Sequence, residues 1–253
     1  MLGINRFKTL GVFIVAGFVF SSSIFAEVTV LRSKGKVWFV NAEGERVKAK
    51  RNQKSDTAVK LVTSKRSRAV ANVNGDILIL SPNSSVEIKS ATWLEQLSGF
   101  IYYSFRTAAE GDPDRKVTTQ TATIGIRGTR LSVAADASEA ATIALEEGKI
   151  EVAPLEGDFA IKRPKAAATF GDYKQQMKDH VNNSKSDFAK YKQQQQEAFV
   201  EYVGSVNMKP GQVLSINGAS AEESMVSEKL EKQMRDMRRF AHDVLSQPEY
   251  KGL

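Results

Sequence analysis

The stretch TQTATIGIRGTRLSVAAD, residues 119–136, decides how the chain folds. Its apolar side chains stand at even positions, Ile124 and Ile126, in the first half and at odd positions, Leu131 and Val133, in the second. Successive side chains of a β-strand point to opposite faces, so this change of parity would turn the apolar side of a regular strand outward. The stretch therefore predicts a strand that is interrupted between its two halves.

A β-bulge is the expected interruption, because one extra residue in a strand restores the register after a change of parity. Gly128 is the predicted bulge residue, since glycine tolerates a positive φ, and Arg127 and Thr129 would then lie at a bend. In the simpler interpretation, Arg127 pairs locally and Thr129 bonds to the backbone. The alternative is that these residues form a shared recognition site.

Short strands separated by turns are predicted from Val28 to about Ala153, where apolar residues recur with a period of two. The clearest signal is Asn74-Gly75, the preferred pair for a two-residue hairpin turn, which lies between two alternating runs. A turn glycine followed by a strand recurs at Gly35, Gly75, Gly148 and Gly211. The pattern favours a mainly β fold, either a sandwich or roll or an irregular solenoid of short strands.

Residues 122–152, ATIGIRGTRLSVAADASEAATIALEEGKIEV, resemble the FecR domain, a periplasmic module named after an iron-citrate signalling protein. The matching positions are Arg127-Gly128-Thr129 and the Glu147-Gly148 block that closes the following strand. Residues 62–88 also resemble the family, and the resemblance covers roughly Val30 to Ala153. It implies a FecR-like β domain over residues 27–164, with Arg127, Gly128, Thr129, Glu147 and Gly148 as motif residues.

The first 26 residues read as a secretory signal peptide, with Arg6 and Lys8 before an apolar run and Ala26 at the expected cleavage point. The alternative is an uncleaved anchor from Leu10 to Ala26, about 17 residues and the short limit of a membrane span. The protein is therefore expected in the periplasm or secreted, or else anchored in the inner membrane. Well-known family members carry a cytoplasmic anti-sigma region before the span, which is not expected in front of this apolar run.

The charge points to an anionic partner. The net charge is +7 for the full chain and +5 without Arg6 and Lys8. Nucleic acid is not an expected partner of an exported protein, so an anionic envelope surface or an envelope protein takes its place. The predicted contacts with such a surface are Arg46, Lys48, Lys50, Arg51, Lys54, Lys65, Arg66 and Arg68.

Two amphipathic helices are predicted after the β domain, over residues 165–206 and 220–253, with a returning strand segment at 207–219 between them. The first has apolar residues at alternating spacings of three and four from Phe170 to Tyr202, and the second has such a stripe from Val226 to Val244. The simplest structure is an antiparallel pair of the two helices. Pairing with a second molecule, which would make a coiled-coil homo-oligomer, is the alternative.

No catalytic, metal-binding or cofactor-binding residues are predicted. The chain has no cysteine, and its two histidines, His180 and His242, fall one in each predicted helix. Glu146 and Glu147 are neighbours on a predicted strand and should face opposite ways. The expected function is a non-enzymatic binding or scaffolding module of the bacterial cell envelope. The alternatives are an envelope sensor or regulator that works through a membrane partner, and an enzyme acting on cell-wall glycans.

Overall fold

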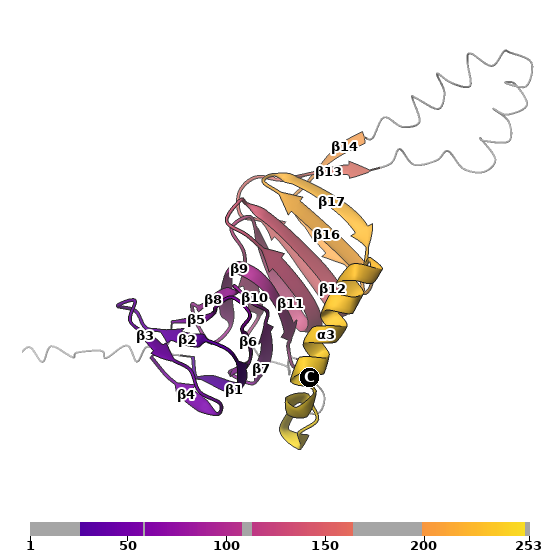
Figure 1. Cartoon of the computed structure of the whole chain (residues 1–253). Helices are drawn as coiled ribbons and strands as arrows, with labels where there is room; N and C mark the ends of the chain where they lie inside the picture. The colour runs from indigo at the N-terminus through magenta and orange to yellow at the C-terminus, as the bar shows by residue number, and fades with distance from the viewer. Residues whose placement is uncertain (1–25, 58, 108–112, 164–198, 251–253) are drawn as a thin grey trace, which may run out of the picture.

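A computed structural model describes residues 26–57, 59–107, 113–163 and 199–250, and these residues form a mainly β structure (Figure 1). All strands belong to one hydrogen-bonded sheet system, which confirms the predicted fold class at the level of a mainly β protein. The strands up to the bulge region are β1 Val28–Lys34, β2 Val37–Val40, β3 Arg46–Lys48, β4 Gln53–Ser55, β5 Lys60–Thr63, β6 Arg68–Val73, β7 Asp76–Leu80, β8 Ser85–Ile88 and β9 Trp93–Ser104. The later elements are β10 Arg115–Thr118, β11 Ala122–Ala135, β12 Ala140–Pro154, β13 Phe159–Arg163, β14 Phe199–Val203, β15 Val206–Met208, β16 Gln212–Asn217, β17 Ser220–Met225, the helix α3 Glu228–Leu245 and the 3-10 turn η1 Pro248–Tyr250.

Most neighbouring strands are antiparallel, while β9 with β10 and β13 with β17 run parallel. Figure 1 shows β1 to β8 curled into a rolled body, from which the long strands β11 and β12 extend toward β16 and β17. Asn74 and Gly75 have positive φ values of 52° and 92° and connect β6 to β7 with Val73 opposite Asp76, which confirms the two-residue hairpin turn. Local turn chemistry thus defines the connection as the sequence predicts.

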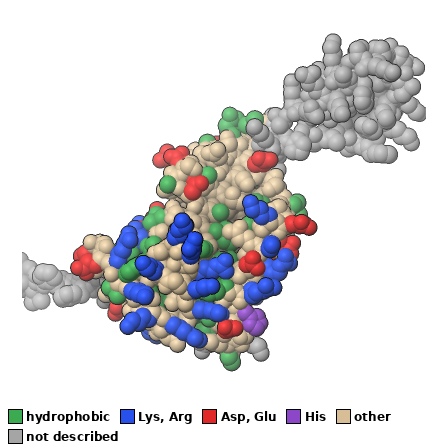
Figure 2. All heavy atoms as spheres, in the orientation of Figure 1, with side chains coloured by type: hydrophobic (Ala, Val, Ile, Leu, Met, Phe, Trp, Pro, Cys, Tyr) green, Lys and Arg blue, Asp and Glu red, His purple; other side chains and the backbone are tan. Residues whose placement is uncertain are grey.

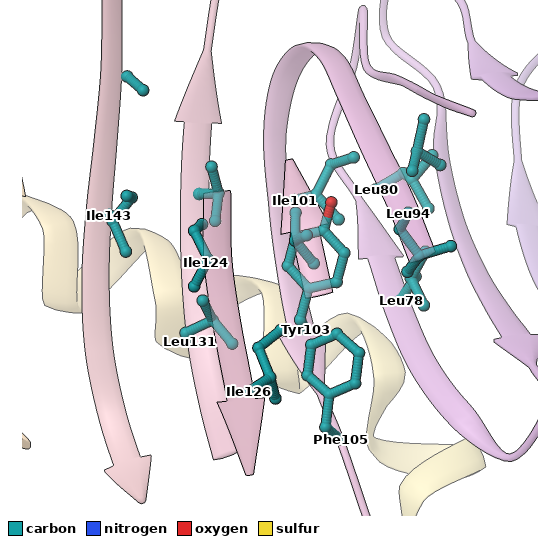
Figure 3. Close-up of a cluster of buried hydrophobic side chains, with 14 of the residues drawn as sticks. Leu78, Leu80, Leu94, Ile101, Tyr103, Phe105, Ile124, Ile126, Leu131 and Ile143 are labelled. Carbon is teal, nitrogen blue, oxygen red and sulfur yellow. The ribbon is translucent and has the colours of Figure 1, made fainter. Parts of the chain in front are cut away.

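The interrupted strand is β11, and its bulge is confirmed. Arg127 pairs with Lys149 and Arg130 pairs with Glu147, so two residues of β11 lie opposite the single residue Gly148. Gly128 has a φ of +57°, as expected of the bulge residue. The four apolar side chains on either side of the bulge, Ile124, Ile126, Leu131 and Val133, are all buried in one core cluster. Figure 3 shows three of them in this cluster with Tyr103 and Phe105.

A second register shift lies directly beyond the first, between Arg130 and Leu131, and it leaves Glu146 of β12 without an opposite residue. Both adjacent glutamates consequently reach the face that α3 covers. The Tyr102 hydroxyl donates to Glu146 Oε2 at 2.5 Å, and Arg130 pairs with Glu147 at 2.9 Å. The expectation that Glu146 and Glu147 face opposite ways is therefore wrong, because the second bulge resets the alternation.

The helix α3 packs on the sheet and not on another described helix. Ser227 caps it by accepting the Leu230 N–H at 3.3 Å. Its buried stripe consists of Met234, Met237, Ala241 and Val244. These side chains form a second core cluster with residues of β6, β7, β9, β12 and β16, namely Val70, Ile77, Ile79, Phe100, Tyr102, Ala144 and Val213.

The predicted pair of long helices is not supported, since the described residues contain one α-helix. The first predicted helix, 165–206, falls largely outside the described residues, and its end is wrong, because Phe199–Val203 is β14, paired with β13. The second begins only at Glu228, because Ser220–Met225 is a strand of the β16–β17 hairpin. No helix among the described ranges is long and apolar enough to cross a membrane, and the predicted signal or anchor before residue 26 lies outside those ranges.

Candidate functional site

The motif glycines are required by close packing at the bulge. A Cβ on Gly128 would lie 2.8 Å from Thr107 Cα, and a Cβ on Gly148 would lie 2.5 Å from Thr129 Cγ2. Thr129 is buried beneath Gly148 and, among the described residues, its Oγ1 has no hydrogen-bond partner. Its carbonyl oxygen instead accepts the Phe105 N–H at 2.9 Å. The predicted side-chain bond from Thr129 to the backbone is therefore absent, and the threonine acts by filling space.

Gly128→Val is expected to lower the free energy of unfolding by about 1–3 kcal/mol. A β-branched residue at positive φ is strained, and its Cβ would also press on the backbone of Thr107. The matched control is Arg127→Ala, which should change stability by no more than about 0.5 kcal/mol because the Arg127 side chain is 82% exposed. Urea unfolding measures both, and equal midpoints for Gly128→Val and the wild type would contradict the bulge.

Arg127 points into a groove on the outer side of β10, β11, β12 and β15. The groove has a volume of about 710 Å³. It is lined by Asp114, Arg115, Gly125, Ile126, Arg127, Gly148, Lys149, Ile150, Glu151, Asn207, Met208 and Lys209. Of the predicted motif residues, Arg127 and Gly148 line the groove, whereas Gly128, Thr129 and Glu147 do not, and Glu147 pairs with Arg130.

Three exposed cations cross the groove at one level. Arg127 of β11 stands directly opposite Lys149 of β12, and Lys209 follows Met208, which pairs with Ile150. Like charges directly opposite each other on neighbouring strands are destabilising. The nearest compensation is Asp114, 3.6 Å from Arg127, but both side chains are more than four-fifths exposed and the pair contributes little. Lys149 and Lys209 are not among the site residues predicted from the sequence, because only the pairing of the strands brings them close to Arg127.

A buried ion pair supports one wall of the groove. Arg115, on β10, places its Nε 3.0 Å from Asp76 Oδ2, and both side chains are almost fully buried. The Arg106 N–H also donates to Asp76 Oδ1 at 3.2 Å. Burial raises the pKa of the Asp76 carboxyl, and the Arg115 charge opposes that shift. The pair ties β7 to β10 and therefore positions one wall of the groove.

The predicted cations of the N-terminal strands lie on several strands and turns of the rolled body. Arg46 pairs with Val40 at one end of β2, whereas Lys65 and Arg66 follow Thr63, which pairs with Val37 at the other end. Lys54 is paired with Glu27 at 2.8 Å. Figure 2 shows Lys and Arg side chains spread over the N-terminal body and along α3. The remaining predicted members are Lys48 on β3, Lys50 and Arg51 in the turn that follows it, and Arg68 on β6.

The polar residues considered for chemistry do not meet at one place. His242 is exposed on α3, 3.9 Å from Asp243, and His180 lies outside the described residues. Within the described part of the chain, no three His, Asp or Glu side chains gather in a way that could hold a metal ion. The site that the structure offers is therefore the charged groove beside the bulge.

The family comparison agrees with the sequence motif. Residues 59–151 match the family model described as FecR protein, a range that holds β5 to β11 and most of β12. Two crystal structures of a candidate anti-sigma factor from Parabacteroides distasonis are similar to the chain at 10% identity, with TM-scores of 0.44 and 0.43. The first similarity covers 74% of this chain and 72% of the solved chain, and the second covers 72% of this chain and 74% of the solved chain. A comparison with curated proteins gives no match.

Proposed function

The chain carries a FecR domain over residues 59–151, and on that premise we propose that the protein is a non-enzymatic binding module of the bacterial cell envelope. Its groove beside the bulge receives a segment of a partner protein. The groove lies mainly on the strands of the family match, with one wall added by β15. Most of the groove thus lies within the family match, while Lys209 lies outside the matched range.

The observation that carries this proposal is the cross-strand pair of Arg127 and Lys149. Two exposed cations directly opposite each other lower the stability of the folded chain, and the exposed Asp114 beside Arg127 offsets this only slightly. A partner that brings carboxylate groups to this level would relieve the repulsion and gain two charge-assisted contacts. We therefore assign the groove to an acidic segment.

The groove also has a means of selecting its partner. Gly125 has no side chain to fill the adjacent level of the groove, and Glu151 and Asn207 stand opposite each other beside it. A carboxylate placed at Glu151 would be repelled, whereas a carboxylate one level away would meet Lys149. Charge placed against the wrong register is a common source of specificity. The partner segment should therefore carry its acids at one level of the groove and neutral or basic side chains at the next.

Export is part of the proposal and rests on the signal-like first 26 residues. N-terminal sequencing of the protein from an envelope fraction should begin at Glu27. An intact Met1 in a membrane fraction would show an uncleaved anchor instead.

Site-specific photo-crosslinking in cells tests the groove. A photoreactive residue at Glu151 or Asn207 should give one discrete adduct, and the same residue at Lys229, on the outer side of α3, should not. Adding Arg127→Glu and Lys149→Glu should abolish the adduct while the protein level stays unchanged. Adducts of equal yield from Glu151 and Lys229, or an adduct that survives the two reversals, would contradict the proposal.

The second candidate function is a sensor or regulator that works through a membrane partner, and the FecR family match favours it. The crosslinked partner separates the two candidates. A partner with a membrane-spanning segment supports regulation, and a partner without one supports scaffolding.

A further inference from the structure

We propose that a second surface, the basic tip, docks the protein on an anionic phospholipid membrane. The basic tip consists of Lys34 at the end of β1, Lys36 in the turn between β1 and β2, Lys65 and Arg66 in the turn between β5 and β6, and Arg68 at the start of β6. The basic tip is distinct from the groove, because it lies on other strands and binds a lipid surface instead of a protein segment. Lys34 and Lys36 do not belong to the cations expected from the sequence.

Backbone contacts hold the two turns of the basic tip together. The Lys36 N–H donates to Ser67 Oγ at 2.8 Å, and the Ser64 N–H donates to the Lys36 carbonyl at 3.0 Å. Gly35 has a φ of +82°, and a Cβ there would lie 2.4 Å from Ser67 Oγ. Lys36, Lys65 and Arg66 are therefore presented together by a tight pair of turns and not by two independent loops, with Lys34 beside them at the end of β1.

The basic tip concentrates positive charge without a matching acid. Lys34 stands directly opposite Arg68 on paired strands, a second destabilising like-charge pair. The salt bridges of the described residues pair the neighbouring Arg32 with Asp243 at 2.7 Å but include no member of the tip. The Arg68 guanidinium lies instead over the Phe240 ring, 5.9 Å from its centre. An external anion is the missing counter-charge.

Arg66 is held in a conformation that favours other residues. Its φ is +59°, a region where glycine, asparagine and aspartate are common and arginine is not. The chain thus carries a cation at a turn position where asparagine or glycine would be less strained. The guanidinium group is suited to phosphate, because its planar donors match two phosphate oxygens.

The shape of the basic tip favours a flat surface over a groove-bound polymer. The two turns contact each other through Ser67 and their cations are exposed, so these side chains can meet one plane together. The exposed large apolar residues of the described chain, Val47, Leu155, Val200, Tyr202 and Met225, all lie outside the tip. The attachment is therefore electrostatic, without insertion, and it must weaken steeply as salt screens the charges. Phosphate headgroups of anionic phospholipid supply the negative plane.

Sedimentation with lipid vesicles tests the basic tip. The wild-type protein should bind vesicles that contain phosphatidylglycerol and should not bind phosphatidylcholine vesicles. It should dissociate when the salt concentration is raised from about 50 to about 500 mM, because salt then screens charge–charge attraction beyond a few ångströms. Each cation near the surface contributes about fivefold to partitioning. The variant Lys36→Ser with Arg66→Asn should therefore bind about 25-fold more weakly.

The matched control removes the same charge elsewhere, with Lys229→Ser and Lys232→Ser on the outer side of α3, and should bind as the wild type does. Arg66→Asn keeps the turn folded, since asparagine adopts the same φ readily, and urea midpoints verify this. An equal loss in both double variants would show a net-charge effect and overturn the proposal. Stronger binding to lipopolysaccharide than to phosphatidylglycerol at equal phosphate, or no vesicle binding, would also overturn it. None of these outcomes affects the groove, which crosslinking tests separately.

Discussion

Replacing Asp76 by alanine is expected to lower the free energy of unfolding by about 3–5 kcal/mol. Asp76 and Arg115 are both almost completely buried and are joined by the 3.0 Å contact between Arg115 Nε and Asp76 Oδ2. Alanine would remove the carboxylate and leave the guanidinium charge in the interior with one counter-charge fewer. It would also remove the acceptor of the Arg106 N–H. The loss should be larger than that from any exposed ion pair of the chain.

The double variant Asp76→Leu with Arg115→Met separates the ion pair from simple packing. Because both charges leave the interior together, it should recover part of the stability that Asp76→Ala loses. Urea unfolding of the wild type and the two variants measures the difference. If Asp76→Ala unfolds at the wild-type urea concentration, the pair does not support the groove wall.

Met237→Ala is expected to lower the free energy of unfolding by about 2–5 kcal/mol. Met237 is 2% exposed and lies in the cluster that joins α3 to the outer face of β6, β7 and β9. Shortening the side chain would leave a cavity between the helix and the sheet. The same face includes Tyr102, whose pKa is raised to about 12, chiefly by burial.

The control for Met237→Ala is Lys232→Ala on the exposed side of the same helix, which should change stability by no more than about 0.5 kcal/mol. Both substitutions favour helix formation, so a difference between them reports packing on the sheet. A Met237→Ala variant as stable as Lys232→Ala would contradict the described packing of α3.

The bulge and the hairpin turns could be predicted because they leave local signals. The change of parity from Ile124 and Ile126 to Leu131 and Val133 is visible in the residues themselves, and Gly128 stands where a positive φ is needed. Asn74-Gly75 defines its turn in the same local way. The FecR resemblance follows from contiguous motifs and is confirmed over residues 59–151.

The helix pair could not be predicted correctly, because amphipathic stripes do not say what they pack against. The stripe from Val226 to Val244 needs an apolar surface, and the face of β6, β7 and β9 that points away from the main core supplies it. Residues 220–225 were assigned to the helix, yet the turn at Gly218 returns them to the sheet as β17. Phe199–Val203 likewise fits a helical spacing but pairs with β13.

The charged surfaces were predicted only in part, because they depend on pairing between distant strands. Lys149 and Arg127 become neighbours through the register of β11 and β12, and Lys209 joins them through β15. The basic tip likewise combines Lys34 and Lys36 with Lys65 and Arg66 only after the two turns meet at Ser67. A run of cations in the sequence gave no indication of this division.

The central claim is that the groove beside the bulge is a binding site. The most direct test is the affinity of the crosslinked partner for purified variants. The groove variant Arg127→Glu with Lys149→Glu is compared by titration calorimetry with the control Lys229→Glu with Lys232→Glu, which has the same net charge. We predict that the groove variant binds at least about tenfold more weakly, as expected when two contacting charges are reversed, and that the control binds like the wild type. Wild-type affinity in the groove variant, or an equal loss in both variants, would contradict the account.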